Sequence, residues 1–527
     1  MSKKRDFTYG AIVLAVSGFL VKLVGAVFKI PLTNLVGSAA MGYFSSAYSI
    51  YVFLLALATS GLPTGVAAMI SRSLTLGKLR DVNKITRIAA AAFISFGTVL
   101  AVLGFIFAMP LAQKMNSSEA YYAVAAIMPA VVCISVVSVL KGFFQGYNNM
   151  VPTAISNLVE AVVKLCAGYG IALYMTNAGY PVEQVVGGAV FGVTLSTFAA
   201  MLFMLARYTF RSKSYRMTLG QFIRDKQTPT RVLARSFFSI TLPIMITSVT
   251  VELFGLLDAA FVVNRLKTYL PDYTANLYWG SYSSMALTIF NLPSFIVIAI
   301  GVSLIPSISA GYAKKDQEVI KDTVDRSLKY SSMLAFACAF GLNSVAGQVL
   351  RLFFSGDSEG VAVATPLLQI VSFALIAVGL TNVTSSILQG IGKAKLTIVT
   401  VTVGACIKTA LTYILLGIES INIYGAPIAT NVAYPVMLGL NIYFIYKNLH
   451  ILPDFKNVFL KPLIAGASCY AASYGVRLCL GSFIPEKIVL FLSIICAIVA
   501  FFAVSLLIKL VNINEFKAFF AKKQKNS

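Results

Sequence analysis

Runs of about 20 or more apolar residues recur along the whole chain, and they constrain its fold more than any other feature. A bilayer offers backbone N–H and C=O groups no hydrogen-bond partners, so such runs cross it as helices. Alternating strands of about ten residues, the pattern of a membrane β-barrel, do not occur in the sequence. The mean hydropathy of +0.83 and the 12% of charged residues fit no soluble domain of 527 residues. The sequence therefore predicts an all-α polytopic membrane protein.

Fourteen membrane helices are predicted, and the distribution of basic residues tests their number. The predicted ranges are 9–36, 43–71, 82–110, 119–147, 152–177, 184–207, 236–263, 281–310, 325–350, 361–390, 395–417, 425–447, 459–479 and 487–511. Lysine and arginine gather on alternate loops, and the opposite loops keep only Lys114, Arg265, Lys267, Arg351, Arg477 and Lys487. The positive-inside rule then gives an even number of helices, with both termini in the cytoplasm. The net charge of +23 is explained by this topology and by attraction to anionic lipid, so no nucleic-acid partner is expected.

Two matching segments divide the chain into halves. Gln145 and Gln389 each precede a glycine, a short turn and a helix, and Lys164 and Lys408 follow them by nineteen residues. A shift of six helices preserves orientation, which indicates a parallel repeat with its axis along the membrane normal. The predicted domains are an N-terminal lobe (1–207), a basic cytoplasmic linker (208–235), a C-terminal lobe (236–447) and two further helices with a basic cytoplasmic tail (448–527).

Eight charged side chains interrupt the predicted membrane helices, and five of them are lysines. They are Lys22, Lys29, Lys141, Lys164, Lys408, Glu160, Glu252 and Asp258. A charge in hydrocarbon costs roughly 3 kcal/mol on insertion scales, so such residues usually face a wet cavity and mark a transport path. The excess of lysine predicts that this path carries an anion.

The lysines of the N-terminal half have alternative roles. Lys22 and Lys29 are seven residues apart on one helix face and are candidates for binding a diphosphate. Snorkelling to an interface is the alternative, and it suits Lys29 better than Lys22. Glu160 and Lys164 have the i, i+4 spacing of an ion pair, which is either structural or opened by substrate phosphate. Lys408 has no acid four residues away, so it is the stronger candidate of the two repeat lysines.

The remaining charges point to coupling or to the interface. Glu252 and Asp258 are six residues apart and do not share a helix face, so one is a candidate lysine partner and the other a candidate proton or sodium site. Lys141 and Arg265 lie near helix ends and are predicted to be interfacial. The cysteines form no C-x-x-C pair, His450 lies in a basic loop, and no phosphate-binding loop occurs. No metal site, cofactor or catalytic centre is therefore predicted.

Short motifs spread over essentially the whole chain carry a family resemblance. They are Lys22–Leu32, Gly61–Pro63, Ile70-Ser71, Gln145-Gly146, Pro152-Thr153, Gln389-Gly390, Gly392-Lys393 and Asn422–Ala426. These motifs resemble the SpoVB/YtgP branch of the MurJ-like lipid II flippases, which share the MOP superfamily with the MATE exporters. The resemblance implies two six-helix lobes in a V shape plus two C-terminal helices, in a bacterial cell membrane.

The resemblance also implies a function. The expected activity is flipping of an undecaprenyl-diphosphate-linked glycan, with lipid II as the leading substrate, from the inner to the outer leaflet by alternating access. Lys22 falls where Gram-negative members have a cavity arginine, whereas the family arginines of helices two and eight fall near Leu55 and Thr288. We hypothesise that the two repeat lysines supply the missing charge. The membrane potential or a monovalent cation would drive the cycle, and the cell-wall synthesis machinery is a candidate partner.

Three alternatives remain open at this point. A flippase for a capsule, teichoic-acid or spore-wall precursor fits the residues equally well. A MATE-type drug exporter would share the fold, but a lysine-lined cavity repels cationic drugs. A membrane scaffold without transport would tolerate replacement of the intramembrane lysines.

Overall fold

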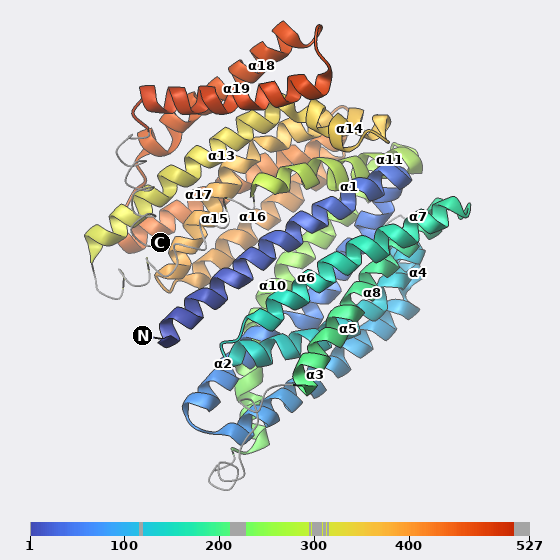
Figure 1. Ribbon diagram of the computed structural model, residues 1–527, viewed down its shortest axis with the longest axis vertical. Helices are drawn as coiled ribbons and strands as arrows, with labels where there is room; N and C mark the ends of the chain where they lie inside the picture. The colour runs from blue at the N-terminus through green and yellow to red at the C-terminus, as the bar shows by residue number, and fades with distance from the viewer. Residues whose placement is uncertain are drawn as a thin grey trace. The chain divides into compact units, whose positions relative to one another are not determined.

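A computed structural model describes residues 2–114, 120–210, 228–294 and 316–510, together with the single positions Val297, Ile308 and Tyr312. Nearly all of these residues are helical and none is in a strand, which confirms the predicted all-α class (Figure 1). The chain forms two compact units, Met1–Gly280 and Ser281–Ser527. Most of the predicted linker lies outside the described residues, so the predicted lobe boundaries stay predictions.

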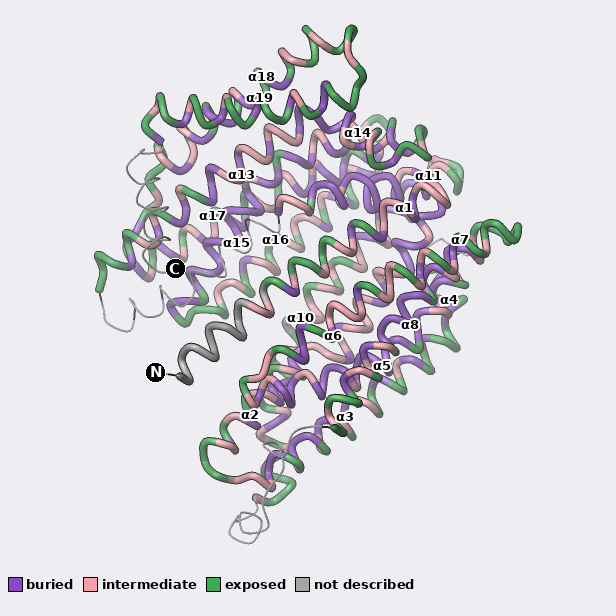
Figure 2. The backbone as a smooth tube through the Cα atoms, in the orientation of Figure 1, coloured by how far each residue is buried: buried purple, intermediate pink, exposed green. Residues whose placement is uncertain are grey.

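Unit 1 contains long helices joined by short turns. Its elements are α1 (Ser2–Thr59), α2 (Leu62–Thr75), α3 (Leu79–Ile106), α4 (Ala108–Lys114), α5 (Tyr121–Gly146), α6 (Val151–Val163), the π-helical turn η2 (Lys164–Gly168), α7 (Tyr169–Asn177), α8 (Val182–Thr209), α10 (Thr230–Leu266) and α11 (Asp272–Gly280). Buried residues run along α5 and α8, which form the centre of this unit (Figure 2).

Unit 2 has the same character. Its elements are η4 (Ser281–Ala286), α13 (Gln317–Phe353), α14 (Ser358–Ser372), α15 (Ala374–Gly390), α16 (Ala394–Leu415), η5 (Asn422–Tyr424), α17 (Gly425–Leu449), η6 (Lys456–Leu460), α18 (Lys461–Leu480) and α19 (Glu486–Leu507). One buried core joins α13, α15 and α17, and a smaller one joins α13, α18 and α19.

The number of membrane spans can be compared with the prediction of fourteen. Eleven helices among the described residues are long and apolar enough to cross a bilayer, or up to twelve if α14 and α15, bent by 46°, form one span. The first two predicted helices fall in one continuous stretch, Val16–Thr75, in which α1 is broken at Gly37 (φ 80°, ψ 163°). The predicted eighth helix lies partly outside the described residues, so the count of fourteen stays a prediction.

The two repeat segments end their first helix in the same way. In unit 1 the N–H of Asn149 donates to the carbonyl of Phe144 (3.0 Å), and the N–H of Asn148, in the left-handed region (φ 59°), donates to that of Gln145 (2.9 Å). This pair of bonds is a Schellman motif. In unit 2, Lys393 donates to Leu388 (2.8 Å) and Gly392 (φ 77°) to Gln389 (3.0 Å). The structure therefore confirms that the matched segments share a turn.

The glycine motifs of α2 and α5 serve close helix packing. A Cβ added at Gly146 would lie 2.7 Å from Ile70, and one at Gly142 would lie 2.9 Å from the carbonyl oxygen of Pro63. Leu62 and Ile70 are fully buried in the core that joins α2, α3, α5 and α10. Gly146, Leu62 and Ile70 therefore contribute to the packing of these helices.

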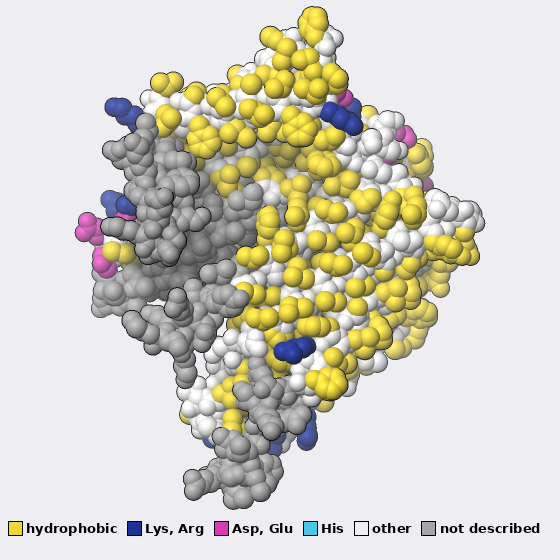
Figure 3. All heavy atoms as spheres, in the orientation of Figure 1, with side chains coloured by type: hydrophobic (Ala, Val, Ile, Leu, Met, Phe, Trp, Pro, Cys, Tyr) yellow, Lys and Arg dark blue, Asp and Glu magenta, His cyan; other side chains and the backbone are white. Residues whose placement is uncertain are grey.

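Apolar side chains cover the visible helix surfaces of each unit, with few charges among them (Figure 3). On α19, for example, Phe491, Val499 and Leu507 are 61%, 61% and 79% exposed. Side chains of this kind are stable at a helix surface that faces lipid. The structure thus has the surface expected of a membrane protein.

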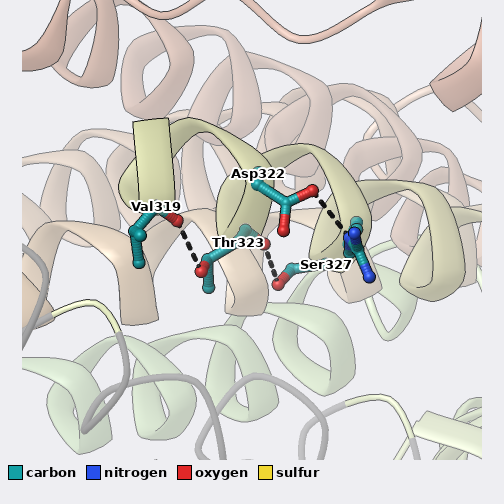
Figure 4. Close-up of polar contacts among 5 residues, drawn as sticks. Val319, Asp322, Thr323 and Ser327 are labelled. Atoms are coloured by element: carbon teal, nitrogen blue, oxygen red, sulfur yellow. Dashed lines mark hydrogen bonds and ion pairs between the residues drawn. The ribbon is translucent and has the colours of Figure 1, made fainter. Parts of the chain in front are cut away.

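Polar contacts mark the first turns of α13, ahead of its apolar part. Asp322 and Arg326 form an exposed i, i+4 ion pair (2.7 Å). The hydroxyl of Thr323 donates to the carbonyl of Val319 (2.7 Å), and that of Ser327 to the carbonyl of Thr323 (Figure 4). These residues satisfy their polar groups within their own helix, as expected near a membrane surface.

A close helix crossing in unit 1 generates the first prediction. A Cβ added at Gly192 of α8 would meet the backbone of Gly168 in η2. We expect Gly192→Ala to lower the stability of the folded protein by about 1–3 kcal/mol, because an extra carbon overpacks the crossing. The matched control is Gly170→Ala, where nothing lies within 4 Å of the added carbon. Thermal unfolding of both variants in detergent tests this, and equal midpoints would contradict it.

Candidate functional site

Two of the predicted lysines lie close together in unit 1. Lys29 is half-buried on α1, and Lys164 is the first residue of η2. Lys164 is close enough to repel the Lys29 ammonium electrostatically. Its Nζ lies 5.9 Å from the ring centroid of Phe28, at the outer limit of a cation–π contact. We call Lys29 and Lys164 the cation pair of unit 1.

The sequence around η2 explains how the cation pair is held. Phe28, which is 2% exposed, packs so closely on Gly168 that an added Cβ there would lie 2.8 Å from its ring. Gly192 of α8 lies against the other side of the same glycine backbone. Small residues at both positions let α1, η2 and α8 approach one another, as is common between membrane helices. The two ammonium groups therefore sit on rigidly packed elements.

The predicted ion pair between Glu160 and Lys164 is not formed. Both residues are described, and no ion pair joins them within the 4.0 Å limit that defines one. The backbone between them is regular α-helix, since the N–H of Lys164 donates to the carbonyl of Glu160, so it is only the two side chains that do not meet. Glu160 attracts the ammonium of Lys141 on α5, although these two residues do not form an ion pair within 4.0 Å either.

Lys141 was predicted to be interfacial, and that position stays a prediction. It is half-buried on α5 and attracted to Glu160. Glu160 and Lys141 belong to different helices, so spacing along the chain carried no signal for this pairing. Glu160 therefore lies within electrostatic range of a lysine on another helix.

The other two predicted binding lysines are placed apart from this pair. Lys22 is exposed on α1, seven residues before Lys29, which corresponds to about 10 Å along a helix. Lys408 lies in unit 2 on α16, where it is half-buried beside the buried Thr409. Unlike Lys164, it sits in a regular α-helix. The roles of these lysines in binding stay predictions.

The two acids assigned to coupling lie on α10 of unit 1. Glu252 is half-buried and Asp258 is 8% exposed. Within the described part of the chain, no cluster of three or more His, Cys, Asp or Glu residues could hold a metal ion. Which ion, if any, these acids bind stays a prediction.

Unit 2 contains an apolar groove that the sequence did not predict. It has a volume of about 610 Å³ and lies between α13 and α19, with Cys469 of α18 and Pro293 at its edges. None of the described residues lining it is charged. The helices on its two sides are more than a hundred residues apart, so only the tertiary fold brings them together. Such a surface accommodates a hydrocarbon chain.

Two family models match the chain. The family described as polysaccharide biosynthesis protein matches residues 7–311, and the MatE family matches residues 281–414. The first match covers more than half of the sequence.

Individual relatives agree with these matches. Stage V sporulation protein B of Bacillus subtilis is 23% identical, over 81% of this chain and 81% of its own length. Lipid II flippase MurJ of the same organism is 23% identical, over 81% of this chain and 80% of its own. The solved structure of a lipid II flippase MurJ in an inward closed conformation superposes with a TM-score of 0.72 at 14% identity, covering 94% of this chain and 98% of that one. This likeness shows that the fold is the polytopic helical fold of MurJ.

The cation pair generates a prediction about stability. Replacing Lys164 by methionine removes its repulsion from Lys29 and leaves an apolar chain of similar length. We expect Lys164→Met to stabilise the protein by about 1 kcal/mol, because it removes this repulsion together with the cost of a half-buried charge. The measurement is thermal unfolding in detergent, with Leu165→Met on the same turn as control. A clearly lower midpoint for Lys164→Met would show that the lysine has a structural partner instead.

Proposed function

Because the chain belongs to the polysaccharide biosynthesis protein family and has the MurJ fold, we propose that it is a flippase for an undecaprenyl-diphosphate-linked cell-wall precursor. Lipid II is the leading substrate. The headgroup would bind to cavity lysines on the inner side and be released on the outer side after a change of access. The lysines would bind the diphosphate, and no step requires bond cleavage.

The observation that carries this proposal is the cation pair of unit 1. Two lysines that repel each other within largely apolar helices favour an anion that contacts both of them. A diphosphate offers several charged oxygens to two ammonium groups at once, and each charge-assisted hydrogen bond contributes about 1.5–3 kcal/mol. The pair therefore favours an anionic cargo over the cationic drugs of a MATE-type exporter.

The apolar groove of unit 2 supports a lipid-linked cargo. A polyprenyl tail is too long and apolar to follow its headgroup through a polar path. The groove between α13 and α19 offers it a surface without charged side chains. We therefore place the tail in this groove while the headgroup moves.

The energy source is proposed from the charge of the lysines. A membrane potential that is negative inside would help unoccupied lysines return inward, since moving one charge is worth about 2.3 kcal/mol per 100 mV. A monovalent cation bound by Glu252 or Asp258 is the competing source. Transport rates that do not respond to the potential would favour the cation.

A second candidate substrate is a spore-wall or other polyprenyl-linked glycan. The similarity to Stage V sporulation protein B is as high as that to the lipid II flippase, at 23% identity. The cation pair and the groove suit any polyprenyl-diphosphate glycan equally. A bacterium whose own lipid II flippase can be switched off separates the two candidates.

The lysines can be tested in that bacterium by complementation. We expect wild type to restore growth and outward-facing lipid II, and Lys22→Gln and Lys408→Gln to lower the rate about tenfold through lost phosphate contacts. Lys487→Gln, at an exposed position at the start of α19, is the control. Rescue by all variants at equal membrane levels would discard the lysine mechanism. No rescue by well-expressed wild type would transfer the proposal to another polyprenyl-linked glycan.

The groove can be tested by filling it. Gly341 lines the groove and has nothing within 4 Å of an added Cβ, so Gly341→Leu occupies the space without a backbone clash. We expect slower transport with normal folding. Gly475→Leu on α18 is the matched control, since that glycine is equally open but lies outside the groove. If both variants transport at the same rate, the tail does not use the groove.

A further inference from the structure

A pocket of about 280 Å³ opens in unit 1 where α2 ends and α10 begins. Its lining combines basic and apolar side chains, among them Arg72, Lys78, Leu76, Val232 and Leu233. We call it the α2–α10 pocket. It takes no part in the proposed transport path, and neither the family motifs nor the cation pair includes its basic residues.

The single carboxylate in the pocket is already engaged. Asp81 is 1% exposed and accepts hydrogen bonds from the backbone N–H (3.1 Å) and the hydroxyl (2.5 Å) of Thr228. Lys78 donates to the same hydroxyl (3.2 Å), and Lys84 donates to the Thr228 carbonyl (3.3 Å). These bonds fix the start of α10 to the turn between α2 and α3. They also bury the negative charge, so the accessible charge of the pocket is positive.

The surroundings of the pocket are strongly basic. Asp81 is the sole acid within residues 62–94 and 228–240. The basic residues of these two ranges are Arg72, Lys78, Arg80, Lys84, Arg87, Arg231 and Arg235. Arg72 is exposed and has no ion-pair partner within the described part of the chain. An anion entering the pocket would therefore meet an available guanidinium.

The apolar part of the lining distinguishes a lipid from a soluble anion. Leu76 and Val232 are 60% and 54% exposed beside these cations. Leu76 also lies between the candidate spans Val16–Thr75 and Leu79–Ile106, which places the pocket at the membrane edge. A soluble anion gains nothing from exposed leucine and valine, whereas a lipid chain does. Basic pockets of this kind between membrane helices bind anionic lipid headgroups.

Topology explains part of the basic charge but not its arrangement. The positive-inside rule requires lysine and arginine near a helix end, and scattered exposed residues such as Arg87 and Arg231 satisfy it. It does not require two cations on the wall of a pocket, with the nearby acid buried. The positive-inside rule therefore does not explain how the charges of this pocket are arranged.

We propose that the α2–α10 pocket binds an anionic phospholipid of the adjacent leaflet as a resident lipid, distinct from the cargo. Arg72 and Lys78 contact the headgroup phosphate, and Leu76 and Val232 contact the first part of an acyl chain. Because Lys78 also donates to Thr228, the bound lipid strengthens the junction between the α2–α3 turn and the start of α10.

Lipid-selective fluorescence quenching tests this with the full-length protein. Thr75→Trp places a fluorescent reporter at an exposed position beside the pocket but outside its lining. The protein without this change gives the fluorescence of Trp279, which is subtracted. The protein is reconstituted in phosphatidylcholine vesicles that contain a small fixed fraction of brominated phosphatidylglycerol or of brominated phosphatidylcholine. We expect preferential quenching by phosphatidylglycerol, with each basic side chain favouring binding about fivefold.

Two double variants separate the pocket from the general surface charge. Arg72→Gln with Lys78→Gln should remove most of the preference for phosphatidylglycerol. Arg87→Gln with Arg231→Gln removes the same number of charges from exposed positions outside the pocket. This variant should keep the preference for phosphatidylglycerol. If the pocket double variant does not fold, the single variant Arg72→Gln replaces it, because the Arg72 side chain is exposed. We then expect a partial loss of the preference for phosphatidylglycerol.

Three results would overturn the proposal. Equal quenching by both brominated lipids would exclude a selective site. If both double variants lost the preference for phosphatidylglycerol to the same extent, general surface charge would explain it. Removal of the preference by inorganic phosphate would show that the site takes a free anion. None of these readouts involves transport, so they are independent of the proposed flippase activity.

Discussion

The function proposed for unit 1 depends on two lysines of like charge that are held close together among largely apolar helices. Lys29 and Lys164 repel each other, and Glu160, one turn before Lys164, forms no ion pair with it. The packing of Phe28 on Gly168, and of Gly168 on Gly192, keeps the elements that carry the lysines in contact. The π-helical turn that begins at Lys164 contains Gly168 and so takes part in this packing. Such an arrangement is expected where an anion binds and leaves again, since a permanent partner carboxylate would compete with it.

A lipid-linked anion requires a cationic site and an apolar surface, and each unit contributes one of them to the proposed function. Unit 1 holds the cation pair, and unit 2 holds the uncharged groove between α13 and α19. The α2–α10 pocket combines both properties on a smaller scale, as a phospholipid requires. These three features share one physical principle. Phosphate is recognised by basic side chains without a free carboxylate, and the hydrocarbon by surfaces without charge.

The sequence predicted the features that depend on local patterns. The apolar runs predicted the all-α membrane class, and the spacing of Gln145 and Gln389 predicted two segments that share a Schellman turn. The features that depend on packing between distant segments were not predictable. Glu160 and Lys164 are one regular α-helical turn apart, yet they form no ion pair, because spacing along a helix does not decide how the side chains meet their other neighbours. The attraction between Lys141 and Glu160, the approach of Lys29 to Lys164 and the apolar groove all join residues from different helices, for which spacing along the chain carries no signal. The roles of Lys22, Lys408, Glu252 and Asp258 stay predictions for the same reason.

The most direct measurement is translocation of an undecaprenyl-diphosphate-linked sugar in vesicles that contain only the purified protein. Wild type and Lys164→Met would be compared at equal reconstitution, with the externally accessible headgroup followed over time. The proposed mechanism predicts protein-dependent translocation by wild type, and a rate about tenfold lower for Lys164→Met despite its expected higher stability, because phosphate contacts are lost. Translocation by Lys164→Met at the wild-type rate, or none by folded wild type across substrates of this class, would contradict the role of the cation pair in transport.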